Sequence, residues 1–244
     1  MTRTEAPREI APGLTVQGIA APLRLGDFKL LACDMDSTLI SIECVDEIAA
    51  AVGKKAEVSA ITEAAMQGHI ADYKESLRQR VALLEGVTLA QLEAIYTERL
   101  RINPGAEALM QAAQATGIAT LLVSGGFTFF SDRVKARLGI QFARSNVLEF
   151  AHGRLTGRMV DQSWGDICDG AEKRRALLEL ASFMGIAPQQ TIAMGDGAND
   201  LLMMGAAGLS VAYHAKPAVR AQAKVAINAG GLDRLLQVFE EKSR

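Results

Sequence analysis

The sequence predicts an α/β protein with a doubly wound parallel sheet and a small helical bundle inserted after the first strand. Two observations predict this fold. From residue 104 onward, helical and β-rich segments alternate along the chain, which is the pattern of a parallel sheet covered by helices. Between residues 43 and 102, apolar residues recur at intervals of three and four without a β-rich run. We therefore expect an amino-terminal extension over residues 1–27, a core over 28–42 and 103–244, and a helical cap over 43–102.

Each element follows from its local sequence. Residues 1–27 are rich in Pro and Gly and too short for an independent domain, and no element is assigned to them. The apolar run Phe28–Cys33 predicts a buried strand, and three or four short helices are expected before Arg101, one of them started by a capping box of Thr88 and Gln91. The remaining expected elements are helices over 106–116, 129–138, 171–184 and from 232, strands over 118–123, 191–194 and 209–212, and a hairpin turn at His152 and Gly153.

Composition excludes several classes of protein. The 244 residues carry a net charge of −2 and no long basic run, which argues against nucleic acid as the main partner. The amino terminus lacks the apolar region of a signal peptide, and no segment approaches the roughly 20 apolar residues of a membrane span. The three cysteines have neither metal-ligand spacing nor an even count, which indicates reduced thiols. We expect a cytoplasmic protein that binds neither nucleic acid nor membranes.

The stretch LLACDMDSTL ends an apolar run with two carboxylates two residues apart, Asp34 and Asp36. At about 4 Å their repulsion is on the order of 4 kcal/mol for a partly buried pair. Asp34, Ser124 and Asp196 all follow predicted strands, so they are expected at the ligand-binding edge of the sheet. With Asp200 nearby, this acidic group suits a hard cation such as Mg²⁺. The alternative is a set of aspartates that only form turns or cap helices.

Five further residues could bind parts of a ligand. Ser124 and Gly125, in a Ser-Gly-Gly turn, offer a hydroxyl and an amide to phosphate oxygens. Lys173 begins an apolar helix face and needs an anion there, unless its side chain snorkels at the edge of the core. Arg80 lies on or beside an apolar stripe of the cap and suits a carboxylate, either of a ligand or of a cap acid. Glu43 could equally be an acidic residue that the helix dipole favours at the start of a helix.

These residues provide one group for each task in phosphate ester hydrolysis. As a hypothesis, Asp34 attacks phosphorus to give an aspartyl phosphate, and Asp36 protonates the leaving alkoxide and then activates water. Mg²⁺ held by Asp34 and Asp196 neutralises charge, while Ser124 and Lys173 bind phosphate oxygens. Two alternatives stay open: transfer of the phosphoryl group to another alcohol, or action on another small phosphorylated amino acid or alcohol. A receiver domain is disfavoured because it would lack the second aspartate and the helical insert.

The motifs DMDST, VSGG, Lys173 and GDGANDLLM, in this order and with a helical insert after the first, resemble the haloacid dehalogenase (HAD) superfamily of phosphohydrolases. Within it, DMDSTLISIECVDEIA, AMQG, ESLRQRVALLEG and VSGGF are similar to the phosphoserine phosphatase family. The resemblance runs from about Phe28 to the end of the chain. It implies a HAD-like Rossmannoid core, Mg²⁺ as cofactor, and O-phospho-L-serine as substrate in the last step of serine biosynthesis.

The resemblance also assigns individual residues. It implies Asp34 as the nucleophile, Asp36 as the acid and base, and Asp196 as a direct Mg²⁺ ligand, with the backbone carbonyl of Asp36 as a further ligand. Asn199 would support substrate binding, and Asp200 would support the metal ligands. Glu43 would bind the substrate amino group and Arg80 its carboxylate.

Overall fold

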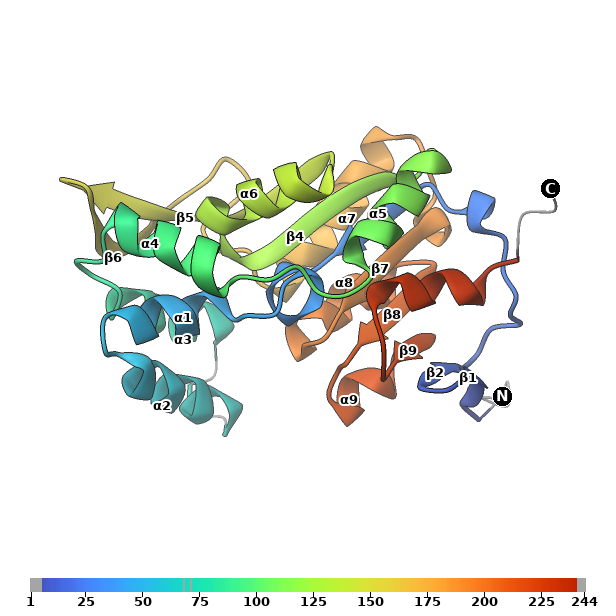
Figure 1. Cartoon of the computed structure of the whole chain (residues 1–244), viewed down its shortest axis with the longest axis horizontal. Helices are drawn as coiled ribbons and strands as arrows, with labels where there is room; N and C mark the ends of the chain where they lie inside the picture. Colours follow the sequence, from blue (N-terminus) through green and yellow to red (C-terminus); the bar gives the residue numbers. More distant parts are fainter. Residues whose placement is uncertain (1–5, 68, 71, 241–244) are drawn as a thin grey trace.

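The computed structural model describes residues 6–67, 69–70 and 72–240 (Figure 1). Residues 1–5 of the expected extension, 68 and 71 of the expected cap, and 241–244 of the expected core lie outside this description. Within the described residues, a single mixed sheet has the strand order β1-β2-β9-β8-β7-β3-β4-β5-β6. The strands are β1 (Arg8–Ala11), β2 (Leu14–Val16), β3 (Leu30–Cys33), β4 (Ala119–Phe127), β5 (Phe142–Ala151), β6 (Arg154–Val160), β7 (Thr191–Gly195), β8 (Leu209–Tyr213) and β9 (Val225–Ile227).

Helices cover both faces of this sheet, as the sequence predicts. The strands from β9 through β8, β7, β3 and β4 to β5 run parallel. Successive β3 side chains point to opposite faces, so Leu31 and Cys33 join one apolar cluster while Leu30 and Ala32 join the other. The first cluster includes residues of α5 (Ala106–Ala115) and α6 (Thr128–Leu138), and the second residues of α7 (Gly170–Phe183) and α8 (Leu201–Ala206). The predicted doubly wound sheet is therefore confirmed.

A second group of helices gathers at one end of the molecule, while β1, β2 and the end of η6 lie toward the other (Figure 1). It comprises α1 (Cys44–Ala51), α2 (Lys55–Met66), α3 (Tyr73–Ala82), α4 (Leu89–Ala94) and the wide-turn helix η3 (Ile95–Arg99). The capping box of Thr88 and Gln91 starts α4 as expected. The chain enters and leaves this insert through two extended segments that pair at Ile40 and Ile102. The division of the chain into extension, core and cap stays a prediction.

The amino-terminal region contains two strands to which the sequence had assigned no element. Residues Arg8–Val16 form a hairpin, with Gly13 at a positive φ of 73°, and β2 pairs antiparallel with β9. Within the hairpin, the β2 side chains of Leu14 and Val16 are buried. Strands of three or four residues have too few positions to show a period, and their pairing partner lies about 200 residues away. The sequence therefore missed both strands of the hairpin, and β9 for the same reason.

Short helices make up the rest of the regular structure among the described residues. The terminal helix expected from residue 232 is a 3₁₀ helix, η6 (Leu232–Val238), followed directly by Phe239, whose ring packs edge-on against Phe28. The remaining short helices are η1 (Leu25–Asp27), η2 (Met35–Leu39), η4 (Pro188–Gln190), η5 (Ala198–Asp200) and α9 (Pro217–Arg220). Among the described residues, no helix has both the length and the apolar content needed to cross a bilayer.

Candidate active site

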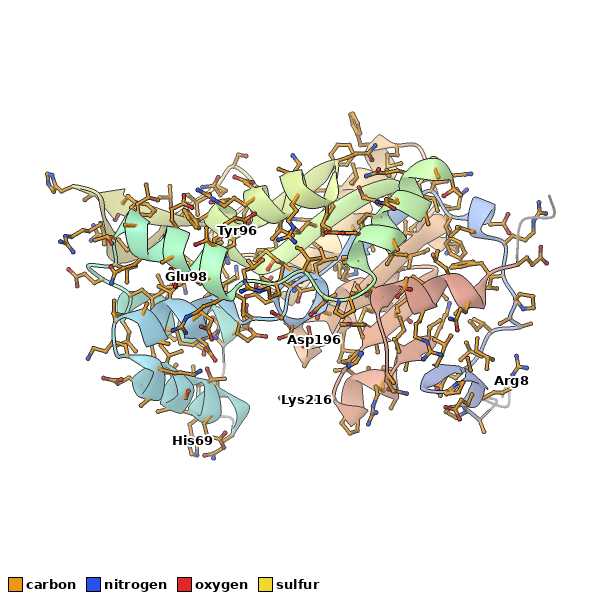
Figure 2. All side chains as sticks on the ribbon, in the orientation of Figure 1. Arg8, His69, Tyr96, Glu98, Asp196 and Lys216 are labelled. Carbon is orange, nitrogen blue, oxygen red and sulfur yellow. The ribbon has the colours of Figure 1, made fainter. Side chains whose placement is uncertain are left out.

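Three neighbouring strands bring the predicted acidic residues to one edge of the sheet. β3 lies between β4 and β7 and is parallel to both, so Asp34 and Asp196, which follow the ends of β3 and β7, lie beside Ser124 in the last part of β4. Carboxylate oxygens of Asp34, Asp196 and Asp200 lie within 4.8 Å of one another. Figure 2 shows Asp196 where the insert helices meet the sheet. The cluster therefore opens toward the helical insert.

Lys173 lies at the centre of this cluster. Its side chain is fully buried, and Nζ is 2.8 Å from Oδ1 of Asp34 and 2.7 Å from Oδ1 of Asp200. The residue sits in the first turn of α7, which Asp169 caps by accepting a hydrogen bond from the Glu172 amide. Burial opposes the charge of the ammonium, but Asp200 and Asp34 outweigh it and raise the pKa of Lys173. The alternative of a snorkelling lysine is therefore wrong.

The cluster has more negative than positive charge. Burial and the charge of Asp200 raise the pKa of Asp34 well above its usual value, against the opposing effect of Lys173. The same two causes raise the pKa of Asp196 to about 6. Buried carboxylates held this close need a cation beyond one lysine. An all-oxygen set of this size fits Mg²⁺, so the residues present suit the predicted metal.

Asp200 also shapes the loop that carries Asp196. Its Oδ2 accepts hydrogen bonds from the backbone amides of Asp196 and Gly197, at 3.2 and 3.0 Å, while its Oδ1 contacts Lys173. A Cβ atom at Gly197 would lie 2.4 Å from Oδ1 of Asn199, so the Asn199 side chain folds over this glycine. Asp200 therefore both fixes the loop and adds a carboxylate to the cluster.

The Asp36 side chain makes its hydrogen bonds to the start of α1. Its carboxylate accepts hydrogen bonds from the backbone amide and the thiol of Cys44, at 3.0 and 3.1 Å. Burial first, and the charge of Glu43 second, raise the pKa of Asp36 to about 7. The chain reaches this arrangement through Ser37, whose φ is 56° in the turn after Asp36. Any contribution of Asp36 to a metal would come from its backbone, as the sequence resemblance implies.

The strand expected to end at Val123 continues through the Ser-Gly-Gly stretch to Phe127, with a register irregularity between Val123 and Phe127, so the expected strand-to-helix turn is wrong. The name Ser-Gly-Gly turn is kept for this irregular stretch, residues 124–126, which is tightly packed. The buried Ser124 Oγ accepts a hydrogen bond from the Gly126 amide at 2.9 Å, which leaves the hydroxyl proton free to donate. The Gly125 carbonyl accepts a hydrogen bond from Nδ2 of Asn146 at 2.8 Å. A Cβ atom at Gly125 would lie 2.2 Å from the hydroxyl of Tyr73, so only glycine fits beneath α3. The turn therefore lies between the sheet edge and the insert.

The two residues expected to bind the ends of the substrate lie on the insert side. Arg80 is half-buried on α3, and its Nε donates a long hydrogen bond of 3.3 Å to the Ser76 carbonyl. Among the described residues no carboxylate lies within 4 Å of its guanidinium, so the alternative of an ion pair with a cap acid is wrong. Glu43 is exposed at the start of α1 and accepts a hydrogen bond from the Ser37 hydroxyl at 2.6 Å.

Sequence reasoning missed several residues that support this site. Thr38 donates a hydrogen bond of 2.9 Å to Oδ1 of Asp196. Asn146 connects the Gly125 carbonyl to the Cys168 amide. Asn103 donates to the carbonyls of Thr38 and Ile40, at 2.8 and 3.0 Å. The position of Thr38 inside the DMDST motif could have indicated a role, but nothing in the local sequence around Asn146 does.

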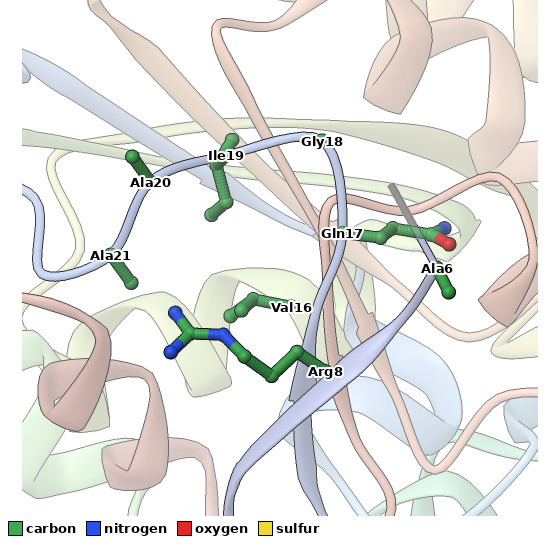
Figure 3. A pocket seen from close by; sticks show the side chains of 8 residues that line it. All are labelled: Ala6, Arg8, Val16, Gln17, Gly18, Ile19, Ala20 and Ala21. Carbon is green, nitrogen blue, oxygen red and sulfur yellow. The ribbon is translucent and has the colours of Figure 1, made fainter. Parts of the chain in front are cut away.

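A separate cavity of about 400 Å³ lies beside the amino-terminal hairpin (Figure 3). Its lining residues are Ala6, Arg8, Val16, Gln17, Gly18, Ile19, Ala20 and Ala21, and none is acidic or nucleophilic. The Gln17 amide already donates to the carbonyls of Ala221 and Ala223. The strands β1 and β2 beside it form the far edge of the sheet from the acidic cluster. None of the predicted site residues therefore lines this cavity.

Comparison with known proteins agrees with this geometry. Residues 31–205 match the family of haloacid dehalogenase-like hydrolases. The chain is 68% identical to a phosphoserine phosphatase of Albidiferax ferrireducens over 96% of this chain and 99% of that protein. A solved phospho-aspartyl intermediate analogue of a phosphoserine phosphatase matches with a TM-score of 0.79 and 35% identity, over 87% of this chain and 99% of that one. A substrate-bound phosphoserine phosphatase complex matches with a TM-score of 0.77 and 34% identity over the same shares. The chain therefore belongs to the phosphoserine phosphatase family of haloacid dehalogenase-like hydrolases.

Proposed function

We propose that this protein hydrolyses O-phospho-L-serine to L-serine and phosphate through an aspartyl phosphate on Asp34, as the last step of serine biosynthesis in the cytoplasm. The observation that carries the proposal is the buried Asp34 carboxylate beside Lys173, at an edge that Asp196 and Asp200 share. Membership of the phosphoserine phosphatase family supports the choice of substrate.

Asp34 is the nucleophile in this mechanism. Its Oδ1 accepts hydrogen bonds from the Met35 amide at 2.7 Å and from Lys173 Nζ at 2.8 Å. Both of these donors contact Oδ1. No described residue donates a hydrogen bond to Oδ2, which is therefore available to attack phosphorus. A bond forms between this oxygen and phosphorus while the ester bond to the serine oxygen breaks. Water later attacks the same phosphorus and releases phosphate, which restores the Asp34 carboxylate.

Asp36 moves the protons. With a pKa of about 7 it is available in its protonated form near neutral pH, so it donates a proton to the departing serine oxygen. The resulting carboxylate then accepts a proton from the attacking water. The hydrogen bonds from Cys44 hold this carboxylate in place beside the Ser124–Gly126 turn, where a Cβ atom at Gly126 would lie 3.4 Å from Oδ1 of Asp36.

The phosphate group is bound by the Ser124 hydroxyl, the Gly125 amide and the Lys173 ammonium. All three groups lie at the edge where Asp34 stands, and two of them belong to a turn whose geometry Asn146 fixes. A buried ammonium and oriented dipoles stabilise the charge that develops on the phosphoryl oxygens without reorganising water.

Asp34 and Asp196, with the Asp36 carbonyl, would hold Mg²⁺, and Asp200 would support them. The ion neutralises the clustered carboxylates and the phosphate when bound. Binding should raise the melting temperature, because a ligand that binds only the folded state stabilises it by mass action. We expect Mg²⁺ to raise the melting temperature of the wild type but not of Asp196→Asn. An equal shift in both proteins would contradict this assignment.

Glu43 and Arg80 would recognise the amino acid portion of the substrate. Arg80 has no carboxylate partner among the described side chains, so its planar guanidinium is free to bind the substrate carboxylate. Glu43 offers an exposed carboxylate to the substrate amino group. Asn199, on the loop that carries Asp196, would complete the substrate site.

The test is phosphate release from O-phospho-L-serine, phosphothreonine, phosphoethanolamine and a nucleotide, each with Mg²⁺ and with a chelator. We expect a Mg²⁺-dependent preference for O-phospho-L-serine. Preference for another ester would agree with the proposed mechanism but contradict the assignment of O-phospho-L-serine as the substrate. Faster product formation when an added alcohol accepts the phosphoryl group would favour a phosphotransferase instead.

A further inference from the structure

We propose that Asp166 is a positioning residue for substrate recognition, whose carboxylate fixes helix α3, and with it Arg80, relative to the phosphate-binding turn. The inference rests on the function proposed above. Asp166 lies in the segment between β6 and α7, which no step of the mechanism uses. Its contacts extend from this segment to α3 of the insert.

Both oxygens of the Asp166 carboxylate contact α3. Oδ1 is 2.6 Å from Nζ of Lys74, and Oδ2 is 2.6 Å from Nη2 of Arg78. Lys74 and Arg78 are four residues apart, so they lie on the same face of the helix and converge on one acid. Lys74 Nζ is also 3.9 Å from the carboxylate of Asp169, the residue that caps α7. One acidic segment thus contacts two successive turns of α3.

The segment that carries Asp166 is itself fixed to the catalytic core. Gln162 and Gly165 exchange two backbone hydrogen bonds, of 2.7 and 3.0 Å, which close the turn before Asp166. Two residues after Asp166, the Cys168 amide donates to Asn146, and Asn146 donates to the Gly125 carbonyl. Hydrogen bonds therefore link the backbone beside Asp166 to the turn that would bind phosphate.

Helix α3 carries the groups that the proposal requires. Arg80 follows Arg78 by two residues, and the hydroxyl of Tyr73, which precedes Lys74, lies against Gly125. Beyond the other end of α3, backbone hydrogen bonds of 2.8 Å join Gly86 and Val87 to Leu155 of the core. The ion pairs at Asp166 thus act on the turns of α3 nearest the site, so their loss would change where Arg80 meets a substrate carboxylate.

The contact is electrostatic and reaches solvent. A cavity of about 270 Å³ opens beside it, lined by residues that include Lys74, Trp164 and Asp166. The side chains of Lys74 and Asp166 are 30% and 36% exposed. Salt screens charges that reach water, so added NaCl should weaken this contact while leaving the buried Lys173 pairs intact.

The test is steady-state kinetics of the Mg²⁺-loaded Asp166→Asn enzyme. Two exposed ion pairs are lost, so we expect KM for O-phospho-L-serine to rise about three- to tenfold, with a smaller change in kcat. The inhibition constant of inorganic phosphate should stay within about twofold, because phosphate contacts Ser124 and Lys173 but not Arg80. Asp166→Glu, which keeps the charge, should bring KM back toward the wild-type value.

The matched control is Glu93→Gln, which removes the ion pair between Arg133 of α6 and Glu93 of α4 without touching α3. Its KM should equal that of the wild type. If Asp166→Asn leaves KM unchanged, or weakens phosphate inhibition by the same factor as it raises KM, Asp166 does not act through Arg80. If the wild type releases no phosphate from O-phospho-L-serine, the proposed function fails, and this inference fails with it.

Discussion

Asp34 has one carboxylate oxygen bound by protein donors and one free, so a single substitution tests its chemistry. Asp34→Asn keeps the shape and the oxygen that accepts from the Met35 amide. It removes the nucleophile, so we expect phosphate release to fall by about 10³-fold or more. The control is Asp132→Asn, an exposed acid on α6, which should retain full activity. Normal turnover of Asp34→Asn, with deamidation excluded by mass spectrometry, would contradict the mechanism.

The buried ion pairs of Lys173 should stabilise the folded protein. Lys173→Met leaves the buried carboxylates of Asp34 and Asp200 without their partner, which we expect to cost about 3–5 kcal/mol in free energy of unfolding. Arg174→Met, at the exposed neighbouring position, should cost less than about 0.5 kcal/mol. Urea denaturation of both variants in the presence of a chelator measures the difference. Equal midpoints would mean that the buried pairs contribute nothing to stability.

For single residues, the sequence predicts a role where the spacing of apolar residues along a helix places the side chain. Lys173 is distinguished from Arg174 because only Lys173 lies on the apolar face of its helix, and the structure buries it. Thr38 and Asn146 could not be found in this way. Their contacts form only in the folded protein, with Thr38 meeting Asp196 from 158 positions away, so a local period reveals neither residue. Only the place of Thr38 inside the DMDST motif could have indicated a role.

Among the elements, the amino-terminal hairpin should contribute to stability but not to catalysis. Leu14 is fully buried and pairs with Ile227 of β9. Leu14→Ala should cost about 2–5 kcal/mol through lost burial and the remaining cavity, and lower the melting temperature by about 5–15 °C. Its kcat and KM at 25 °C should be unchanged, because the hairpin lies at the edge of the sheet away from β3. Arg8→Gln, at an exposed position of β1, is the control and should melt with the wild type.

The same hairpin shows where prediction of elements fails. β3, β4 and β7 are predictable because each contains a mainly apolar, β-rich run followed by polar residues, and their parallel order then places Asp34, Ser124 and Asp196 together. β1, β2 and β9 have only three or four residues each. Strands this short gain their stability from pairing with distant segments, so local sequence cannot reveal them.

For the whole molecule, the insert over residues 43–102 is connected to the core by only two chain segments. They pair at Ile40 and Ile102, and the Ser41 amide donates to the Arg101 carbonyl at 3.0 Å. We predict hinges near Ser41 and Asn103, about which the insert closes over a bound phosphate group. In the closed state, the ion pairs of Asp166 with α3 would fix Arg80, carried by the insert, relative to Ser124, carried by the sheet.

Limited trypsin digestion tests this closure. With Mg²⁺ and a phosphate analogue such as orthovanadate, cleavage within residues 43–102 should slow, because the closed state restricts the local opening that proteolysis requires. Arg24, exposed in the segment before β3 and far from the insert, is an internal control whose cleavage should not change. Equal slowing at both places would indicate general stabilisation by the ligand. Unchanged cleavage at both would mean that the insert binds substrate without moving, and that Arg80 is already in its final position in the free protein.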